Sequence, residues 1–179
     1  MSGRILCVRE DAIATVTLSN PGKLNAIDFA MWQKLAEVLR EVSGDEQVRC
    51  VVLRGDGEQA FAAGGDIEEF LHRRDTLERA LAYHAQVGAA LQAVFDCRHP
   101  TIALLQGACI GGGLEIAAQC DLRVCGESSR FGAPINKLGF SMYPGEMAGL
   151  LRLAGAATVF EILLEGRILG AAEALAKGL

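Results

Sequence analysis

The chain has 179 residues, of which 51% are hydrophobic and 22% are charged, and its formal net charge is −5. This length can bury a sizeable core, so we predict a single domain over residues 1–179. The negative charge, and the lack of a basic run interleaved with aromatic residues, exclude a nucleic-acid surface. Charges such as Arg152 and Glu161 interrupt the apolar stretches, which excludes a membrane span.

Six cysteines lie mostly in apolar segments, with no CxxC pair and no histidine cluster nearby. This pattern favours reduced, buried thiols over disulfides and predicts no metal site. The chain starts with a polar, strand-like segment rather than a signal peptide, so we predict a cytoplasmic protein. The cysteines are Cys7, Cys50, Cys97, Cys109, Cys120 and Cys125.

The first predicted elements are two paired strands, at the alternating runs 5–9 and 12–18. Asp28 is a candidate N-cap for a helix whose apolar residues recur at helical spacing and stop near Gly44. Residues 50–53 then predict a short buried strand.

The middle of the chain predicts two helices, a short one at residues 67–71 with Asp66 as its N-cap and an amphipathic one at residues 77–95. His99-Pro100 ends the longer helix. The apolar run 101–105 predicts another strand.

The last predicted elements are a helix at residues 114–119, a strand at 122–125, and helices at 145–164 and 171–177. Strands that alternate with helices indicate an α/β fold.

The glycines at 111–113 lie between the apolar run and the helix that follows it. Their backbone can approach a substrate closely, and free amides at a helix start can hold a developing oxyanion. Glu115 places a carboxylate within a turn of those amides, which suits proton transfer next to a carbonyl. The alternative is that the glycines only permit close helix–sheet packing, while Glu115 complements the helix dipole.

A second glycine turn, at residues 61–66, also leads from a strand-like run to a helix. Two such turns can supply two N–H donors to one oxygen, and removing one oxyanion donor typically costs about 3 kcal/mol of transition-state stabilisation. The alternative is a helix-capping loop with Asp66 as the N-cap.

In their order and spacing, these segments resemble the enoyl-CoA hydratase/isomerase (crotonase) superfamily. The resemblance covers the chain from about residue 5 to its end and implies an α/β spiral of ββα units. It also implies a C-terminal helical region that helps to form trimers, and we expect that region to be absent because the chain stops where it would begin. The matching pieces are residues 20–26 (NPGKLNA), 61–67 (FAAGGDI), 111–115 (GGGLE), 120–123 (CDLR), 131–134 (FGAP) and 137–139 (KLG).

The resemblance implies an enzyme of fatty acid metabolism that binds an acyl-CoA thioester and stabilises its enolate. The two N–H donors fall on Gly65 and Gly112, and Glu115 falls on the first of the two family glutamates. It implies no cofactor beyond the coenzyme A of the substrate, no membrane or nucleic-acid partner, and a homotrimer or hexamer.

The resemblance also implies a set of substrate-binding residues along the CoA and acyl path. Lys23 is placed to meet the CoA phosphates, although a solvated turn lysine fits the sequence equally well. The set comprises Lys23, Leu24, Ala26, Ala63, Asp66, Ile67, Gly113, Pro134, Ile135 and Tyr143.

Two positions depart from the family pattern. Ile135 stands where the second glutamate is expected, and an alkyl side chain can neither orient water nor transfer a proton, so we predict weak enoyl-CoA hydration. Tyr143 occupies a usual glycine position and is interpreted as a plug, with a hydrogen-bonding or acid role as the alternative. His84 lies on the long predicted helix and could face either way.

Two other functions fit the sequence less well than this enzyme does. A catalytically silent acyl-CoA binder or assembly subunit fits Ile135, but it would have little reason to keep Glu115 beside intact glycine turns. A dinucleotide-binding oxidoreductase fails because residues 107–113 do not read GxGxxG and no ribose-binding acid follows.

Overall fold

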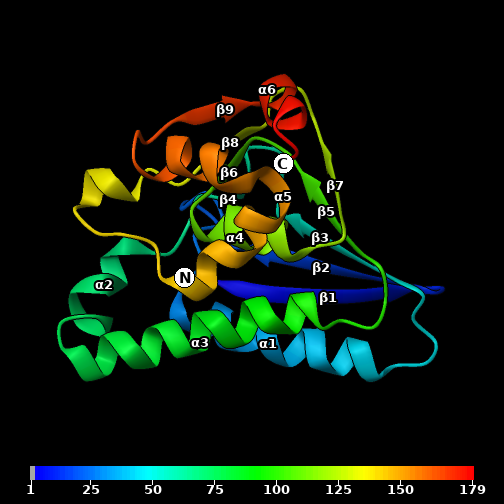
Figure 1. Cartoon of the computed structure of the whole chain (residues 1–179). Helices are drawn as coiled ribbons and strands as arrows, with labels where there is room; N and C mark the ends of the chain where they lie inside the picture. Colours follow the sequence, from blue (N-terminus) through cyan, green and yellow to red (C-terminus); the bar gives the residue numbers. More distant parts are fainter. Residues whose placement is uncertain (1–2) are drawn as a thin grey trace.

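The computed structural model describes residues 3–179, which form two sheets (Figure 1). The larger sheet has the order β1-β2-β3-β5-β7, antiparallel between β1 and β2 and parallel elsewhere. The smaller sheet has the order β4-β6-β8-β9, antiparallel only between β8 and β9. The strands are β1 (Arg4–Glu10), β2 (Ile13–Ser19), β3 (Cys50–Gly55), β4 (Ala60–Ala62), β5 (Thr101–Leu105), β6 (Ala108–Ile110), β7 (Leu122–Cys125), β8 (Arg130–Gly132) and β9 (Ile168–Gly170).

From β3 to β8, strands of the two sheets alternate along the chain, and helical segments follow each pair. β3 and β4 precede α2 and α3, β5 and β6 precede α4, and β7 and β8 precede a 3₁₀ turn and α5. This repetition is the spiral of ββα units, so the predicted fold class is confirmed. The helical segments are α1 (Phe29–Gly44), α2 (Ile67–Arg73), α3 (Leu77–Phe95), α4 (Gly112–Gln119), the 3₁₀ turn η1 (Ile135–Leu138), α5 (Pro144–Leu163) and α6 (Ala171–Ala176).

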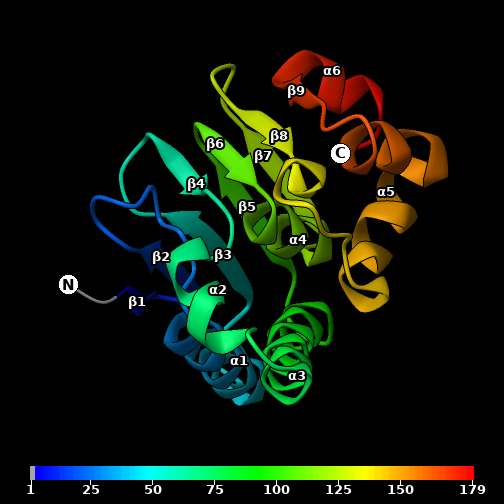
Figure 2. The same cartoon turned by 90° about the vertical axis from the view of Figure 1, so that its left-hand side faces the viewer.

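Helices α1 and α3 lie together along one side of the larger sheet (Figures 1 and 2). The apolar residues that recur along α1, such as Trp32, Leu35 and Leu39, are fully buried. Asp28 caps α1 as predicted, because its Oδ1 accepts from the Met31 amide at 2.8 Å. Both helices contribute side chains to the wall of a cavity, Trp32 from α1 and Val87 from α3.

The structure differs from the expectations in three respects. The strand-like run that enters the glycine turn at residues 61–66 is β4, but the other short strands of the smaller sheet were not predicted. Gly155, at φ +70°, interrupts the last long helix. Cys7 and Cys125 are exposed rather than buried. They lie on β1 and β7, the two edge strands of the larger sheet, which are open to solvent.

None of the helices in residues 3–179 combines the length and apolar character needed to cross a bilayer.

Candidate active site

A cavity of about 360 Å³ lies between α3 and the N-terminal ends of α4 and α5. Most of its wall is apolar and includes Trp32, Phe70 and Val87. The polar groups that face it are the backbone of two glycine turns and the side chains of Arg74, Tyr83, His84, Glu115, Lys137 and Glu146.

The two glycine turns predicted from the sequence meet in this cavity. A Cβ atom built on Gly112 would lie 3.6 Å from the backbone nitrogen of Gly65. Neither the Gly65 nor the Gly112 amide donates a hydrogen bond to an acceptor within residues 3–179. Two unpaired N–H groups therefore lie close together beside the cavity.

A side chain at Gly112 would collide with its neighbours, and one at Gly65 would be in tight contact with them. A Cβ on Gly112 would lie 2.8 Å from the Trp32 ring, and one on Gly65 would lie 3.2 Å from the Phe70 ring and from Tyr83 Oη. Glycine at both positions thus allows the close approach of the two backbones.

Glu115 lies in the first turn of α4, and only 7% of its surface is exposed. Burial raises its pKa well above the ordinary value, the charge of Glu146 raises it further, and Arg74 partly opposes both. No donor in residues 3–179 hydrogen-bonds to its carboxyl group, so this group faces the cavity unpaired.

Glu146 is a second carboxyl group on the cavity wall, and sequence reasoning missed it. It lies in the first turn of α5, and its Oε1 is 2.8 Å from His84 Nδ1. His84 Nε2 in turn is 3.0 Å from Arg74 Nη2. The only signal in the sequence was the placement of His84 on a long helix, which did not settle the direction in which it faces.

The predicted site residues fall into three groups. The residues that line the cavity are Ala63, Gly65, Ile67, Gly112, Glu115, Pro134 and Ile135. Lys23 and Asp66 line a more open pocket of about 750 Å³. Leu24, Ala26, Gly113 and Tyr143 line neither of these two pockets.

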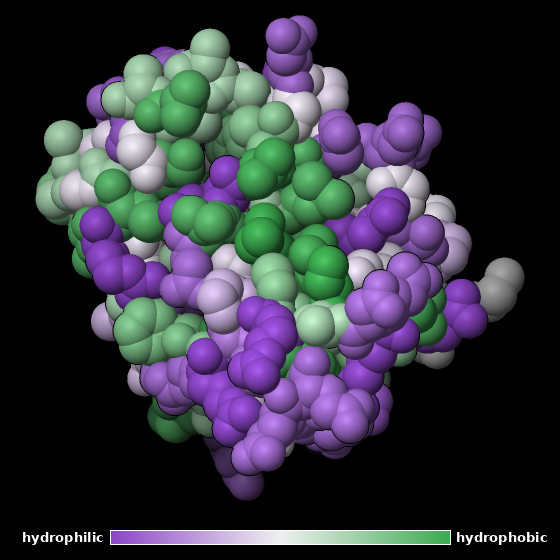
Figure 3. Space-filling view, turned by 90° about the vertical axis from the view of Figure 1, so that its right-hand side faces the viewer, coloured by the Kyte–Doolittle hydropathy of each residue, from purple (hydrophilic) through white to green (hydrophobic). Residues whose placement is uncertain are grey.

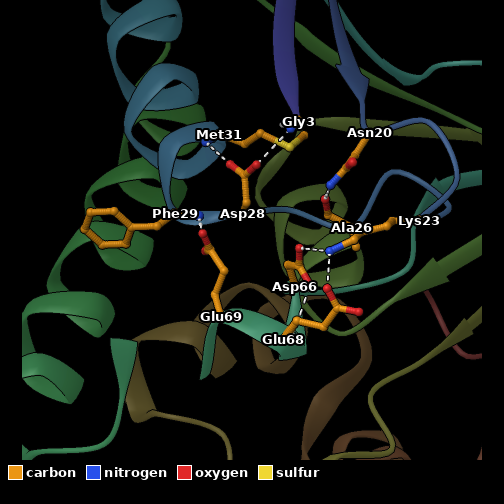
Figure 4. Close-up of polar contacts among 10 residues, drawn as sticks. All are labelled: Gly3, Asn20, Lys23, Ala26, Asp28, Phe29, Met31, Asp66, Glu68 and Glu69. Atoms are coloured by element: carbon orange, nitrogen blue, oxygen red, sulfur yellow. Dashed lines mark hydrogen bonds and ion pairs between the residues drawn. The ribbon is translucent and has the colours of Figure 1, made fainter. Parts of the chain in front are cut away.

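Lys23 is held by two carboxylates at the edge of the open pocket (Figure 4). Its Nζ lies 2.7 Å from Asp66 Oδ2 and 2.7 Å from Glu68 Oε2. Asp66 also caps α2, since its Oδ1 accepts from the Glu68 amide at 3.2 Å. The Lys23 charge is therefore already paired within the protein. The sequence had suggested either a contact with the CoA phosphates or a solvated lysine.

Gly113 and Tyr143 lie outside the cavity for different reasons. A Cβ on Gly113 would lie 2.5 Å from the Ala62 carbonyl oxygen, so this glycine permits α4 to pack against β4. The Tyr143 ring stacks on His84 at a centroid distance of 4.9 Å, and 47% of the residue is exposed. Tyr143 covers His84 from outside, which corrects its interpretation as a plug in the pocket.

Comparisons with known proteins identify relatives of the chain as a whole. The family model described as enoyl-CoA hydratase/isomerase matches residues 8–179. A short-chain-enoyl-CoA hydratase of Clostridium acetobutylicum is 32% identical over 179 residues, which cover 98% of this chain and 66% of the relative. A Rhizobium meliloti protein named "Probable enoyl-CoA hydratase" is 34% identical, with the same coverage.

Among solved structures, an enoyl-CoA hydratase/carnithine racemase from Magnetospirillum magneticum superposes with a TM-score of 0.95 at 49% identity. The match covers 97% of this chain and 65% of that one. The chain thus spans about two thirds of the length of these relatives.

Proposed function

The chain belongs to the enoyl-CoA hydratase/isomerase family, and from that premise we propose that it binds an acyl-CoA thioester and moves protons next to the thioester carbonyl. The proposed enzyme acts in the cytoplasm and uses no cofactor beyond the coenzyme A of its substrate. The observation that carries this proposal is the pair of unpaired amides, Gly65 and Gly112, beside the buried Glu115.

The two amides would accept the charge that develops during the reaction. When a proton leaves the carbon next to the thioester carbonyl, negative charge moves to the carbonyl oxygen. Two fixed N–H donors aimed at that oxygen stabilise the enolate, and each donor is worth about 3 kcal/mol.

Glu115 would carry the proton at that carbon. Its raised pKa keeps it protonated over a wider pH range than an exposed glutamate, so it can deliver a proton to an enolate as a general acid. In the reverse direction its carboxylate takes the same proton back. The apolar wall of the cavity, including Phe70 and Val87, suits an acyl chain.

The proposal is tested by incubating the protein with a panel of acyl-CoA thioesters and identifying products by mass spectrometry. Glu115→Gln should keep binding and lose about 10²–10⁴-fold of turnover, because a positioned acid–base group contributes that much. The control is Glu165→Gln, an exposed glutamate outside the cavity. Unchanged turnover in Glu115→Gln would contradict the role of Glu115 and favour a silent acyl-CoA binder.

Crotonyl-CoA hydration should be weak in the unchanged protein, because Ile135 cannot hold the attacking water. Ile135 lines the cavity, so Ile135→Glu should raise the hydration rate. Hydration by the unchanged protein at the rate of an efficient enzyme would show that another group positions the water.

A further inference from the structure

Arg74, His84 and Glu146 form a continuous chain of polar contacts along one wall of the cavity. Arg74 Nη2 lies 3.0 Å from His84 Nε2, and His84 Nδ1 lies 2.8 Å from Glu146 Oε1. The three residues come from the C-terminal end of α2, the middle of α3 and the first turn of α5. A connection between three separate segments positions the last member, Glu146, more firmly than its own helix could.

The hydrogen-bonding chemistry of arginine fixes which atoms donate and which atoms accept in these contacts. A guanidinium group only donates hydrogen bonds, so His84 Nε2 must be the acceptor and Nδ1 must carry the proton. His84 is then neutral and donates from Nδ1 to Glu146. The Arg74 guanidinium is itself held over the Phe70 ring at 4.6 Å and the Phe140 ring at 4.8 Å.

Glu146 is more than a helix cap. Its Oε2 accepts from the Tyr143 amide at 3.3 Å, which is a capping contact of α5. Its Oε1 is bound by the polar chain described above. Only 9% of the residue is exposed, and it lines the same cavity as Glu115. Both oxygens accept hydrogen bonds, which is the pattern of a carboxylate, whereas Glu115 has the surroundings of a neutral acid.

We infer that Glu146, positioned by His84 and Arg74, is the second acid–base group of this cavity and that the pair Glu115–Glu146 shifts the double bond of an enoyl thioester. This inference rests on the proposed function, because it needs the enolate that the two amides would hold. It places the second carboxylate on α5 rather than at the Ile135 position.

The reaction balances as two proton transfers. Starting from a 2-enoyl thioester, Glu146 takes a proton from C4, and the C4–H electrons form the C3–C4 double bond. The electrons of the C2–C3 double bond move toward the carbonyl, whose oxygen takes the charge beside Gly65 and Gly112. Glu115 then gives its proton to C2, which yields the 3-enoyl thioester. Glu146 ends protonated and Glu115 ionised, the state from which the reverse reaction starts.

The surroundings favour a carbon-bound proton over water as the partner of Glu146. The cavity that it lines has apolar walls that include Phe70, Val87 and Met142, and Ile135 adds a further alkyl side chain to them. A hydrocarbon chain fits these walls better than an ordered water molecule does.

The test follows 3-hexenoyl-CoA in D₂O by mass spectrometry and NMR, with the unchanged protein and three variants. The unchanged protein should form 2-hexenoyl-CoA with deuterium at C4. Glu146→Gln should lose at least about a hundredfold of this isomerisation and still exchange the C2 hydrogens through Glu115. Glu115→Gln should lose both reactions, and His84→Leu should behave like Glu146→Gln with a smaller loss.

The amide of Glu146→Gln keeps one of the two acceptor oxygens, so the variant should still melt in one cooperative transition, at a temperature no higher than that of the unchanged protein. Glu165→Gln should change neither reaction. Full isomerisation by Glu146→Gln, or parallel loss of exchange and isomerisation, would overturn the inference. So would an unchanged protein that exchanges C2 hydrogens without isomerising, and that result would leave the proposed function intact. Failure of the unchanged protein to bind acyl-CoA or exchange C2 hydrogens would instead refute the proposed function itself.

Discussion

The buried carboxyl group of Glu115 should make the stability of the protein depend on pH. Its folded pKa is raised above the unfolded value, chiefly by burial and next by the charge of Glu146. Between these two pKa values the folded state binds more protons than the unfolded state, so the free energy of unfolding falls as pH rises. Each unit of difference corresponds to about 1.4 kcal/mol.

Glu115→Gln removes this titration, so its free energy of unfolding should match that of the unchanged protein below the unfolded pKa. At higher pH the variant should be the more stable one, by a margin that grows until the folded pKa is passed. Urea denaturation across the pH range measures the margin. A constant difference between the two proteins at every pH would contradict the buried, neutral state of Glu115.

The sequence predicted those parts of the cavity that local backbone chemistry determines. Gly65, Gly112 and Glu115 stand in short motifs, so their roles could be proposed before the fold was known. Glu146 and His84 are 62 positions apart, and only tertiary packing brings them together. The pairing of Lys23 with Asp66 was not predicted, because it depends on side-chain directions that no motif specifies.

Helix α1 depends on Asp28 at its N-terminus (Figure 4). Asp28 accepts from the Met31 amide and, through Oδ2, from the Gly3 amide at 2.9 Å. Asp28→Ala should lower the free energy of unfolding by about 1–2 kcal/mol, the usual cost of a lost cap. Asp28→Asn keeps one oxygen acceptor and should lose less, as measured by urea denaturation. Equal losses would show that the charge matters more than the cap.

Two helical glycines should respond in opposite ways to alanine. A Cβ on Gly113 meets the Ala62 carbonyl, so Gly113→Ala should lower the free energy of unfolding by about 1–3 kcal/mol. A Cβ on Gly88 in α3 meets nothing within 4 Å, so Gly88→Ala should raise it by up to about 1 kcal/mol. Thermal melts of both variants test the difference, and similar shifts would contradict the packing described for α4.

The long elements could be predicted because each carries several turns of its pattern. The helix predicted at residues 77–95 is α3, with the same bounds. The strands of the smaller sheet have three residues each, too few for an alternating pattern to be recognised. They form because the strands of the larger sheet hold these segments side by side. Their pairing therefore depends on the topology of the fold and not on the local sequence.

Apolar side chains gather on the upper part of one face of the molecule, while its lower part is mostly polar (Figure 3). The edge strand β7 also carries two exposed apolar residues, Leu122 and Val124. Apolar side chains on an edge strand favour association with another chain. We therefore expect this protein to form homotrimers or hexamers in solution, as family membership suggests.

Light scattering over a range of concentrations measures this association. Val124→Lys should weaken it, whereas Leu77→Lys, a change at the still more exposed start of α3, should not. A stable monomer at all concentrations would contradict the expectation.

Residues 134–142, which form part of the cavity wall, are held mainly by local hydrogen bonds. Their backbone bonds are local, such as Gly139 to Asn136 and Lys137 to Pro134, and Asn136 Nδ2 adds one longer link to the Leu164 carbonyl. Segments with few long-range bonds open at a lower free energy than the sheets around them. Amide hydrogen exchange in this wall should therefore be fast while α3 stays protected, and a ligand that fills the cavity should slow it. A ligand would then enter and leave the cavity without any opening of the hydrophobic core.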